Sequence, residues 1–275
     1  MLNDRPVFAP VRRKGAWRRK AAAGLLCAMT AAGGLAAIAP RAVAQEFTPA
    51  QKKEIEALVR NYILQNPEVL QEAMNALEQR QEEARAERRS QTLAAQRDRV
   101  FAPAGAVVAG DPQGDVTLVE FFDYNCGFCK RSLADLERLM KADRRLKIVL
   151  RDLPVLGQGS LDAARVAVAA QKQLSGPKAF EYHARLMKVN GRVGKEQAEA
   201  VAREMGLDMD RLAKDAQSDA TLEVLKENHA LAQLLDVNGT PAFVVGDTVI
   251  PGAVGHAALE QVIGSVRKCG KASCG

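Results

Sequence analysis

Two cysteines separated by two residues, Cys126 and Cys129, are the side chains of this sequence best suited to covalent chemistry. Residues 116–122, which precede them, are nearly all apolar and mostly β-branched or aromatic, as is typical of a strand buried on both faces. Leucines at helical spacing follow over residues 133–139. The pattern therefore places Cys126 where a buried strand ends and a helix begins.

A cysteine at the start of a helix has a distinctive electrostatic environment. Its sulfur lies among unpaired backbone N–H groups at the positive end of the helix dipole, and both favour thiolate over thiol. The pKa of such cysteines falls from about 8.5 to between roughly 3.5 and 7.5, which makes the sulfur a good attacking and leaving group. Cys129, one turn further on, is expected to be more buried and to resolve a mixed disulfide. The pair predicts thiol–disulfide exchange through a redox-active Cys126–Cys129 disulfide.

Two other features complete the candidate site. Glu120 lies on the predicted strand before Cys126 and is a candidate carboxylate relay for the proton of Cys129. Thr240-Pro241 opens a later apolar strand, where proline leaves neighbouring backbone groups free and a cis bond would present them to a substrate chain. The alternatives are a solvated or salt-bridged carboxylate for Glu120 and a simple turn for Thr240-Pro241.

The same cysteines fit other kinds of site. With Cys269 and Cys274 they have the ligands of a four-cysteine zinc site, and alone they fit a static disulfide. Two thiolates this close also suit Cu(I), a soft ion, so Cys126 and Cys129 are candidate copper ligands. For Cys269 and Cys274 we expect a small disulfide in the tail.

The elements around these residues predict an α/β domain over residues 100–275. Residues 116–150 form a strand–helix–strand unit, and residues 160–235 predict several helices without a strand. The sheet resumes at residues 240–245, where Gly246-Asp247 can turn a hairpin, and a closing helix follows over residues 256–268. An all-helical insertion thus interrupts the sheet.

Residues 45–99 predict a separate helical segment. Thr48 begins a capping box, and two helices with apolar faces follow over residues 49–65 and 67–77. Residues 79–99 are polar, as in a solvated helix or a flexible linker. The apolar faces need a partner, either the main domain or copies of themselves. We favour self-association, because the polar segment would hold these helices away from the domain.

Residues 1–44 predict an export signal. A basic stretch, an Ala/Leu-rich run over residues 21–39 and Ala42-Val43-Ala44 predict cleavage near Ala44, with a membrane anchor as the alternative and Sec or twin-arginine export left open. This leader holds eight of the 39 Lys and Arg residues and one of the 33 acidic residues, so the remainder is nearly neutral. With 4% aromatic residues, a base-stacking nucleic-acid platform is not expected. The four cysteines after the leader suit an oxidising periplasm.

The motif Glu-Phe-Phe-Asp-Tyr-Asn-Cys-Gly-Phe-Cys of residues 120–129, a helical insertion and then Gly-Thr-Pro at residues 239–241 resemble the DsbA-type thioredoxin-fold oxidoreductases. The amino-terminal helices make residues 46–275 similar to the ScsC (suppressor of copper sensitivity) branch. The resemblance implies a thioredoxin fold with a helical insertion, Cys126 as nucleophile, Cys129 as resolving residue, and Thr240 with a cis-Pro241 facing the disulfide. It also implies a homo-oligomer, with a trimer expected, and a membrane ScsB- or DsbD-type reductase as partner. No other cofactor is expected.

One departure from the family pattern bears on the reaction. Oxidases of the DsbA type usually have Pro-His between the cysteines, whereas Gly127-Phe128 has no imidazole and resembles the Gly-Tyr of isomerases. The sequence therefore favours a periplasmic disulfide isomerase or reductase acting on misoxidised exported proteins. A copper(I) carrier and a DsbA-like oxidase are the alternatives.

Overall fold

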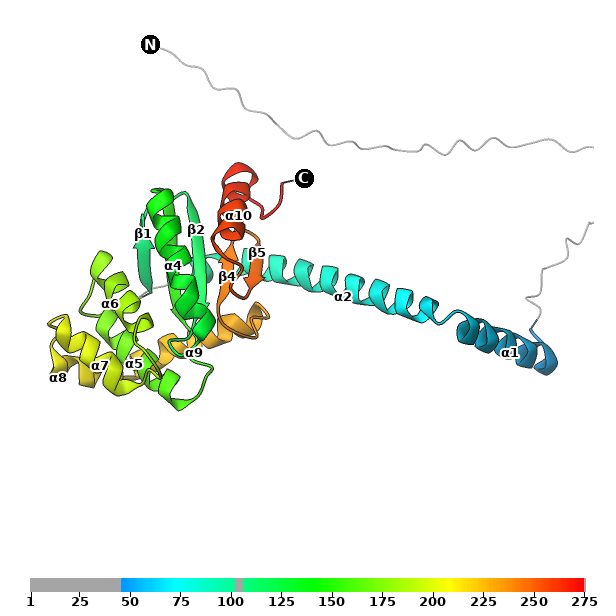
Figure 1. Ribbon diagram of the computed structural model, residues 1–275, viewed down its shortest axis with the longest axis horizontal. Coiled ribbons are helices and arrows are strands. Elements are labelled where there is room, and N and C mark those ends of the chain that lie inside the picture. Colours follow the sequence, from blue (N-terminus) through cyan, green and yellow to red (C-terminus); the bar gives the residue numbers. More distant parts are fainter. Residues whose placement is uncertain (1–45, 102–105, 275) are drawn as a thin grey trace, which may run out of the picture. The chain divides into compact units, whose positions relative to one another are not determined.

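The computed structural model describes residues 46–101 and 106–274 (Figure 1). The predicted export signal, residues 1–44, lies outside the described residues. Two compact units meet between Tyr62 and Ile63. Along the described parts of the chain, no helix combines the length and apolarity needed to cross a membrane.

The first unit contains most of helix α1 (Pro49–Gln65). The predicted capping box is formed, since the Thr48 N–H donates to Gln51 Oε1 at 2.9 Å and the Gln51 N–H to Thr48 Oγ1 at 3.3 Å. No residue of α1 is buried, and its large apolar side chains, among them Leu58 and Tyr62, are exposed. The apolar face that the sequence predicts is therefore available to a partner.

Helices α2 (Glu68–Ala95) and α3 (Arg97–Phe101) follow. Helix α2 runs without a break through most of the polar segment, so that segment is a helix and not a flexible linker. Two apolar residues near its end are buried, Leu93 in α2 and Val100 in α3, and the sequence did not predict this burial. Two isolated apolar residues seven positions apart form no stripe that periodicity detects.

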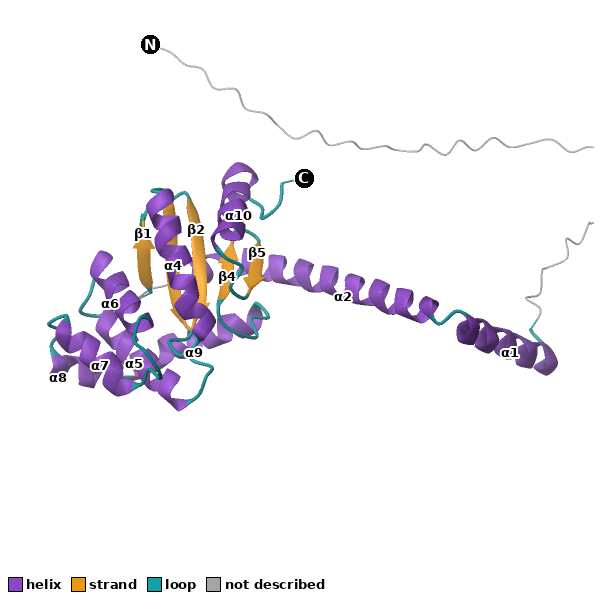
Figure 2. Cartoon of the chain, in the orientation of Figure 1, coloured by secondary structure: helices purple, strands orange, loops and turns teal. Residues whose placement is uncertain are grey.

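A five-stranded mixed sheet forms the centre of the second unit (Figure 2). Its strands are β1 (Val107–Gly110), β2 (Val116–Phe122), β3 (Leu146–Asp152), β4 (Ala242–Val245) and β5 (Thr248–Pro251), in the order β1-β3-β2-β4-β5. Strands β2 and β3 are parallel, and the other pairs are antiparallel. The predicted α/β fold is confirmed, with β2, the strand that leads to the Cys pair, in the middle of the sheet.

The two faces of β2 pack against different helices. Leu118 and Phe122 belong to the core cluster that includes α4 (Gly127–Ala142) and α10 (His256–Cys269). Val119 and Phe121 belong to the other cluster, with the end of α2, α3 and α9 (Asp219–Leu234). Because side chains alternate along a strand, Glu120 lies on the same face as Leu118 and Phe122, which α4 covers.

The helical insertion lies between β3 and β4 and consists of α5 (Gln158–Gln171), α6 (Pro177–Met187), α7 (Lys195–Glu204), α8 (Met209–Ala216) and α9. Helix α5 is rich in small buried residues and contacts each of the other four, so it is the central helix of the insertion. Helix α6 also contacts β1 and α4, which joins the insertion to the sheet domain.

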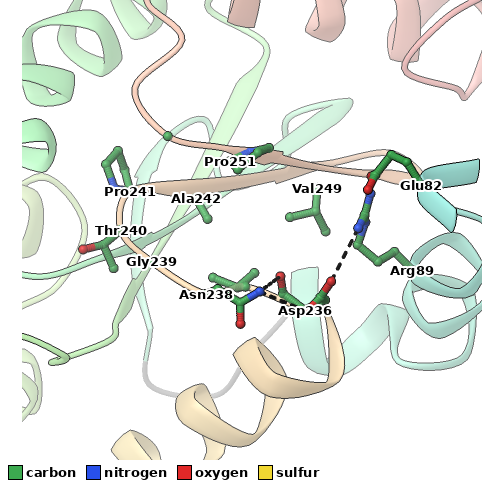
Figure 3. Close-up of a pocket in the computed structure, with 12 residues that line it drawn as sticks. Glu82, Arg89, Asp236, Asn238, Gly239, Thr240, Pro241, Ala242, Val249 and Pro251 are labelled. Carbon is green, nitrogen blue, oxygen red and sulfur yellow. Dashed lines mark hydrogen bonds and ion pairs between the residues drawn. The ribbon is translucent and has the colours of Figure 1, made fainter. Parts of the chain in front are cut away.

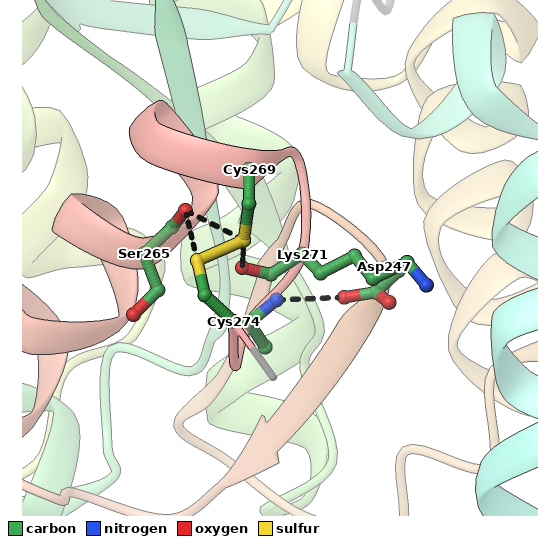
Figure 4. The surroundings of a disulfide bond; sticks show 6 residues. Asp247, Ser265, Cys269, Lys271 and Cys274 are labelled. Atoms are coloured by element: carbon green, nitrogen blue, oxygen red, sulfur yellow. Dashed lines mark hydrogen bonds between the residues drawn. A yellow bond between two sulfur atoms is a disulfide. The ribbon is translucent and has the colours of Figure 1, made fainter.

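The tail closes on itself through a disulfide between Cys269 and Cys274, as predicted (Figure 4). The carboxylate of Asp247, in the turn between β4 and β5, accepts a hydrogen bond from the Ala272 N–H at 2.9 Å. Because Cys269 and Cys274 are bonded to each other, they do not form a four-cysteine zinc site with Cys126 and Cys129. Among the residues described here, no group of three or more side chains could hold a metal ion.

Candidate active site

Cys126 is the amino-terminal cap of α4, and a turn of three residues separates it from the end of β2. Its N–H donates to the carbonyl of Asp123 at 3.0 Å, which closes the turn. Its sulfur accepts the N–H of Cys129 at 3.3 Å. Cys126 is thus a helix cap in which sulfur takes the place that oxygen usually has.

Thr240 and Pro241 lie against this sulfur, although they are more than a hundred residues away in sequence. The pairing of β2 with β4 sets Phe121 opposite Ala242, so the loop that leads into β4 passes beside the Cys126 turn. The Cys126 sulfur lies 3.1 Å from the Thr240 carbonyl oxygen, to which its protonated form donates, and the Thr240–Pro241 peptide bond is cis. The structure therefore brings together the two motifs that the sequence singled out.

The two sulfurs differ strongly in acidity. The pKa of Cys126 is lowered to about 5, chiefly by a hydrogen bond from the Cys129 side chain and further by the backbone N–H groups of Cys129 and Phe128, against the opposing effect of burial. The pKa of Cys129 is raised, chiefly because this side chain is buried, and further by its hydrogen bond to Cys126 and by the charge of Glu120. At neutral pH Cys126 is therefore a thiolate and Cys129 a thiol.

Glu120 is fully buried, with 1% of its surface exposed. Its pKa is raised to about 8 by burial first and then by the charge of Cys126. The Oε1 atom has no hydrogen-bond partner among the described residues. This environment differs from that of a solvated or salt-bridged carboxylate, and it leaves Glu120 free to exchange a proton near neutral pH.

An open cavity of about 590 Å³ lies beside the cis-proline loop (Figure 3). Residues 236–242 line one side, and the other side includes Arg89 and Glu82 of α2. Arg89 is held between Glu82, at 2.6 Å, and Asp236, at 3.7 Å. The surface next to Thr240 and Pro241 is thus concave and partly charged, and it has room for a polypeptide segment.

The polar residues that hold the turn before Cys126 were not predicted from the sequence. Asp123 and Asn125 lie in the turn before Cys126. Both bond to Ser160 in the helical insertion, and Asn125 also bonds to Val193. Their position between a strand end and a reactive cysteine was a signal, but the partners lie 35 to 68 residues away and no spacing rule connects them.

Two family models match this chain. The DSBA-like thioredoxin domain matches residues 117–264, and the copper resistance protein ScsC N-terminal domain matches residues 51–84. The first match contains the Cys pair and the Thr-Pro loop, and the second contains most of α1 and the first half of α2.

Solved structures agree with these matches. A thioredoxin-like oxidoreductase from Silicibacter pomeroyi DSS-3 is 41% identical, with a TM-score of 0.60 over 63% of this chain and 98% of that one. Proteus mirabilis ScsC in a transitional conformation is 31% identical, with a TM-score of 0.58 over 81% and 99%. Salmonella enterica Typhimurium BcfH is 26% identical, with a TM-score of 0.68 over 79% and 96%.

Curated relatives are much longer proteins. A Na(+)/H(+) antiporter NhaA 1 of Mycobacterium sp. (strain KMS) is 29% identical over 143 residues, which are 50% of this chain and 23% of the antiporter. The antiporter NhaA of Herminiimonas arsenicoxydans is 26% identical over 164 residues, 25% of its length. The chain therefore spans about a quarter of the curated relatives it matches.

Proposed function

This chain belongs to the DsbA-like thioredoxin family of thiol–disulfide oxidoreductases and to its ScsC branch, and we propose that it is a disulfide isomerase or reductase of exported proteins. The observation that carries the proposal is the unequal sulfur pair beside Thr240–Pro241, in which Cys126 has a pKa lowered to about 5 and Cys129 is buried. Gly127-Phe128 between the cysteines supports isomerase or reductase work over oxidation, because no imidazolium is present to stabilise the thiolate further.

The first step is attack by the Cys126 thiolate on one sulfur of a substrate disulfide. The substrate S–S bond breaks, a mixed disulfide with Cys126 forms, and the other substrate sulfur leaves as a thiolate. In isomerisation this thiolate, or another one of the substrate, attacks a different disulfide, and the last exchange releases Cys126 unchanged. No net electron transfer occurs.

Reduction uses Cys129 in a second step. Cys129 loses its proton and attacks the Cys126 sulfur, which releases the substrate sulfur as a thiolate and leaves a Cys126–Cys129 disulfide. Two electrons have then passed from the pair to the substrate. We propose that a membrane reductase of the ScsB or DsbD type returns the pair to its dithiol form.

Glu120 is the proposed acceptor of the Cys129 proton. While Cys126 is a thiolate, its charge helps to raise the pKa of Glu120 to about 8, so the carboxyl holds a proton at neutral pH. Formation of the mixed disulfide removes that charge, which lowers the pKa of Glu120 part of the way, while burial continues to raise it. The carboxylate fraction therefore increases at the step that needs a base.

The amino-terminal helix supports a homo-oligomer, with a trimer as the proposed form. The face of α1 is apolar and exposed, and its sequence matches the ScsC amino-terminal domain. An assembly with several Cys126 sites suits repeated attack on one misoxidised substrate. The family match and the predicted leader of residues 1–44 support export to the periplasm.

Refolding of scrambled, disulfide-mispaired ribonuclease tests the proposed activity. The reduced protein is expected to restore ribonuclease activity, and Cys126→Ser is expected to restore none. Full activity of Cys126→Ser would contradict the mechanism. The redox equilibrium with glutathione, measured together with the native mass, separates the subtypes, because a strongly oxidising monomer would point to an oxidase.

Copper(I) carriage is a second candidate function. Two free sulfurs lie at one helix end, and the matching amino-terminal family is described as a copper resistance protein. Cu(I) prefers thiolate ligands, so Cys126 and Cys129 would be the ligand pair and the ion the cargo. Titration of the reduced protein with Cu(I) against a competing chelator tests this, and equal affinity of wild type and Cys126→Ser would refute it.

A further inference from the structure

Asp123, at the end of β2, is a buried carboxylate that is fully supplied with hydrogen bonds. Only 2% of its surface is exposed. Oδ1 accepts the N–H of Asn125 at 2.7 Å and the hydroxyl of Ser160 at 2.7 Å. Oδ2 accepts the N–H groups of Val155 at 2.8 Å and Leu156 at 3.0 Å. Four donors fill the acceptor positions of a carboxylate, so an acceptor-only side chain is required here.

Asn125, the residue directly before Cys126, pairs with the backbone of a distant loop. Its Oδ1 accepts the Val193 N–H at 2.7 Å, and its Nδ2 donates to the Val193 carbonyl at 2.8 Å. Nδ2 also donates to Ser160 Oγ at 3.0 Å. The side-chain amide thus pairs with both backbone groups of Val193 in the α6–α7 loop, as a neighbouring strand would. Ser160 links the two turn residues, because it accepts from Asn125 and donates to Asp123.

The residue directly after the cysteine pair holds the same loop. Lys130 Nζ donates to the carbonyls of Val189 at 2.6 Å and Gly191 at 3.2 Å. Asn125 and Lys130 therefore flank the redox motif and fix residues 189–193 of the helical insertion from both sides. Neither contact involves the substrate surface at Thr240–Pro241.

We propose that Asn125 is a positioning residue for disulfide exchange, which locks the turn before Cys126 to the insertion loop and so keeps the nucleophilic sulfur aligned with the N–H groups of α4. The proposal rests on the proposed function, because it concerns the same sulfur. It also gives the helical insertion a role, which is to hold the turn that follows β2.

The physical reason lies in how steeply hydrogen bonds depend on geometry. The Cys129 N–H meets the Cys126 sulfur at 3.3 Å only while the turn from Asp123 to Cys126 keeps its shape. Removal of the Asn125 amide leaves the buried Val193 N–H and C=O without their partner and lets both segments separate. The thiolate then loses part of its stabilisation and becomes harder to form.

The experiment measures the pH dependence of Cys126 alkylation by iodoacetamide in the full chain, with Asn125→Ala as the test variant. A rise of about one pH unit in the midpoint would leave about one eleventh of the sulfur as thiolate at pH 5 in place of one half, so alkylation there is expected to be about five times slower. Ser160→Ala, which removes one bond from each partner, is expected to shift the midpoint in the same direction by less.

Gln173→Ala is the matched control. Gln173 forms the same kind of pair within the insertion, since its side chain accepts the Asp208 N–H at 2.9 Å and donates to the Asp208 carbonyl at 3.0 Å. This control loses two bonds of the same kind at an exposed site and is expected to keep the wild-type midpoint. Equal midpoints for Asn125→Ala and Gln173→Ala would overturn the proposal.

Two readouts keep the result interpretable. Hydrogen exchange at the Val193 amide is expected to accelerate in Asn125→Ala, and an unfolded variant is recognised by exchange throughout the chain. In that case the midpoint of Ser160→Ala decides, and an unchanged midpoint in that variant would overturn the proposal. Alkylation needs no disulfide substrate, so failure to refold ribonuclease would reject the proposed function and leave the role of Asn125 to be decided separately.

Discussion

The two cysteine pairs of this chain lie at opposite ends of helices. Cys126 caps the amino terminus of α4, where backbone N–H groups and the helix dipole stabilise a thiolate. Cys269 is the last residue of α10, where the dipole has the opposite sign, and it is joined to Cys274. The two pairs have the same residue type, so their position on a helix distinguishes them. A sulfur at the start of α4 lies where a thiolate is stabilised, and a sulfur at the end of α10 does not.

Burial reinforces this difference. Cys126 and Cys129 lie in the core cluster between β2 and α4, next to the carboxyl of Glu120. Cys269 is exposed and Cys274 partly exposed at the end of the chain. The first pair therefore lies beside a buried carboxyl, which we propose as its proton acceptor, and the second ties the tail to the end of α10.

The strongest test of the comparison removes each pair in turn. Cys126→Ser is expected to lower the rate of scrambled-ribonuclease refolding by at least about a hundredfold, because the oxygen nucleophile cannot form a mixed disulfide. The Cys269→Ser/Cys274→Ser double variant is expected to keep the rate within about twofold, since these residues are remote from the site. A large loss in the double variant would show that the tail pair takes part in exchange.

Removal of the tail disulfide is instead expected to affect stability. A short cross-linked loop stabilises a fold by about 2 kcal/mol when its ends are otherwise free to separate. The Asp247 hydrogen bond to the Ala272 N–H already restrains this segment, so the loss in urea unfolding is expected to be at or below that value.

A second, smaller effect is expected from Glu120→Gln. The amide cannot accept a proton, so the step in which Cys129 resolves the mixed disulfide is expected to slow by about ten- to a hundredfold. The attack by Cys126 does not use this group, and its rate is expected to stay close to that of the wild type. Stopped-flow measurement of mixed-disulfide formation and decay separates the two steps.

Equal decay rates in Glu120→Gln and wild type would show that the proton leaves Cys129 by another route. Asp152 offers an internal control, since its carboxyl is also buried, has a pKa raised to about 7 by burial and lies on the neighbouring strand. Asp152→Asn is expected to leave both steps unchanged.

The sequence predicted the reactive pair and its partners because their signals are local. A strand pattern before Cys126, a helix pattern after it and a Thr-Pro before a second strand place these residues without knowledge of the tertiary structure. The contacts of Asn125 with Val193 depend on how the insertion folds back, which no local pattern encodes.

The buried Arg151 illustrates the same limit. It lies in an apolar strand pattern, and its guanidinium donates to the carbonyls of Arg99 and Val100 and, at 2.7 Å, to the Asn228 side chain. Only the packing of α3 and α9 on this face of the sheet supplies these acceptors. The position of Arg151 in a strand therefore did not indicate which residues would accept its hydrogen bonds.

The last expected effect concerns how the stability of the reduced protein depends on pH. The lowered pKa of Cys126 means that the folded state favours the thiolate. Its contribution to the unfolding free energy is therefore present above the unfolded pKa and is lost as the pH falls through about 5. The raised pKa of Glu120 acts in the opposite direction, because the folded state retains a proton up to about pH 8 that the unfolded state releases near 4.5. Between pH 5 and 8 the two contributions offset each other.

Glu120→Gln is therefore expected to steepen the pH dependence. With the carboxyl removed, the unfolding free energy of the reduced protein should rise with pH between 5 and 8 by up to about 1.4 kcal/mol per pH unit more than in wild type. Urea unfolding at several pH values measures this slope. The Glu120→Gln/Cys126→Ser double variant is expected to lose the added slope, whereas loss of the tail disulfide should leave it intact. A slope that persisted in the double variant would mean that the thiolate at the start of α4 is not its source.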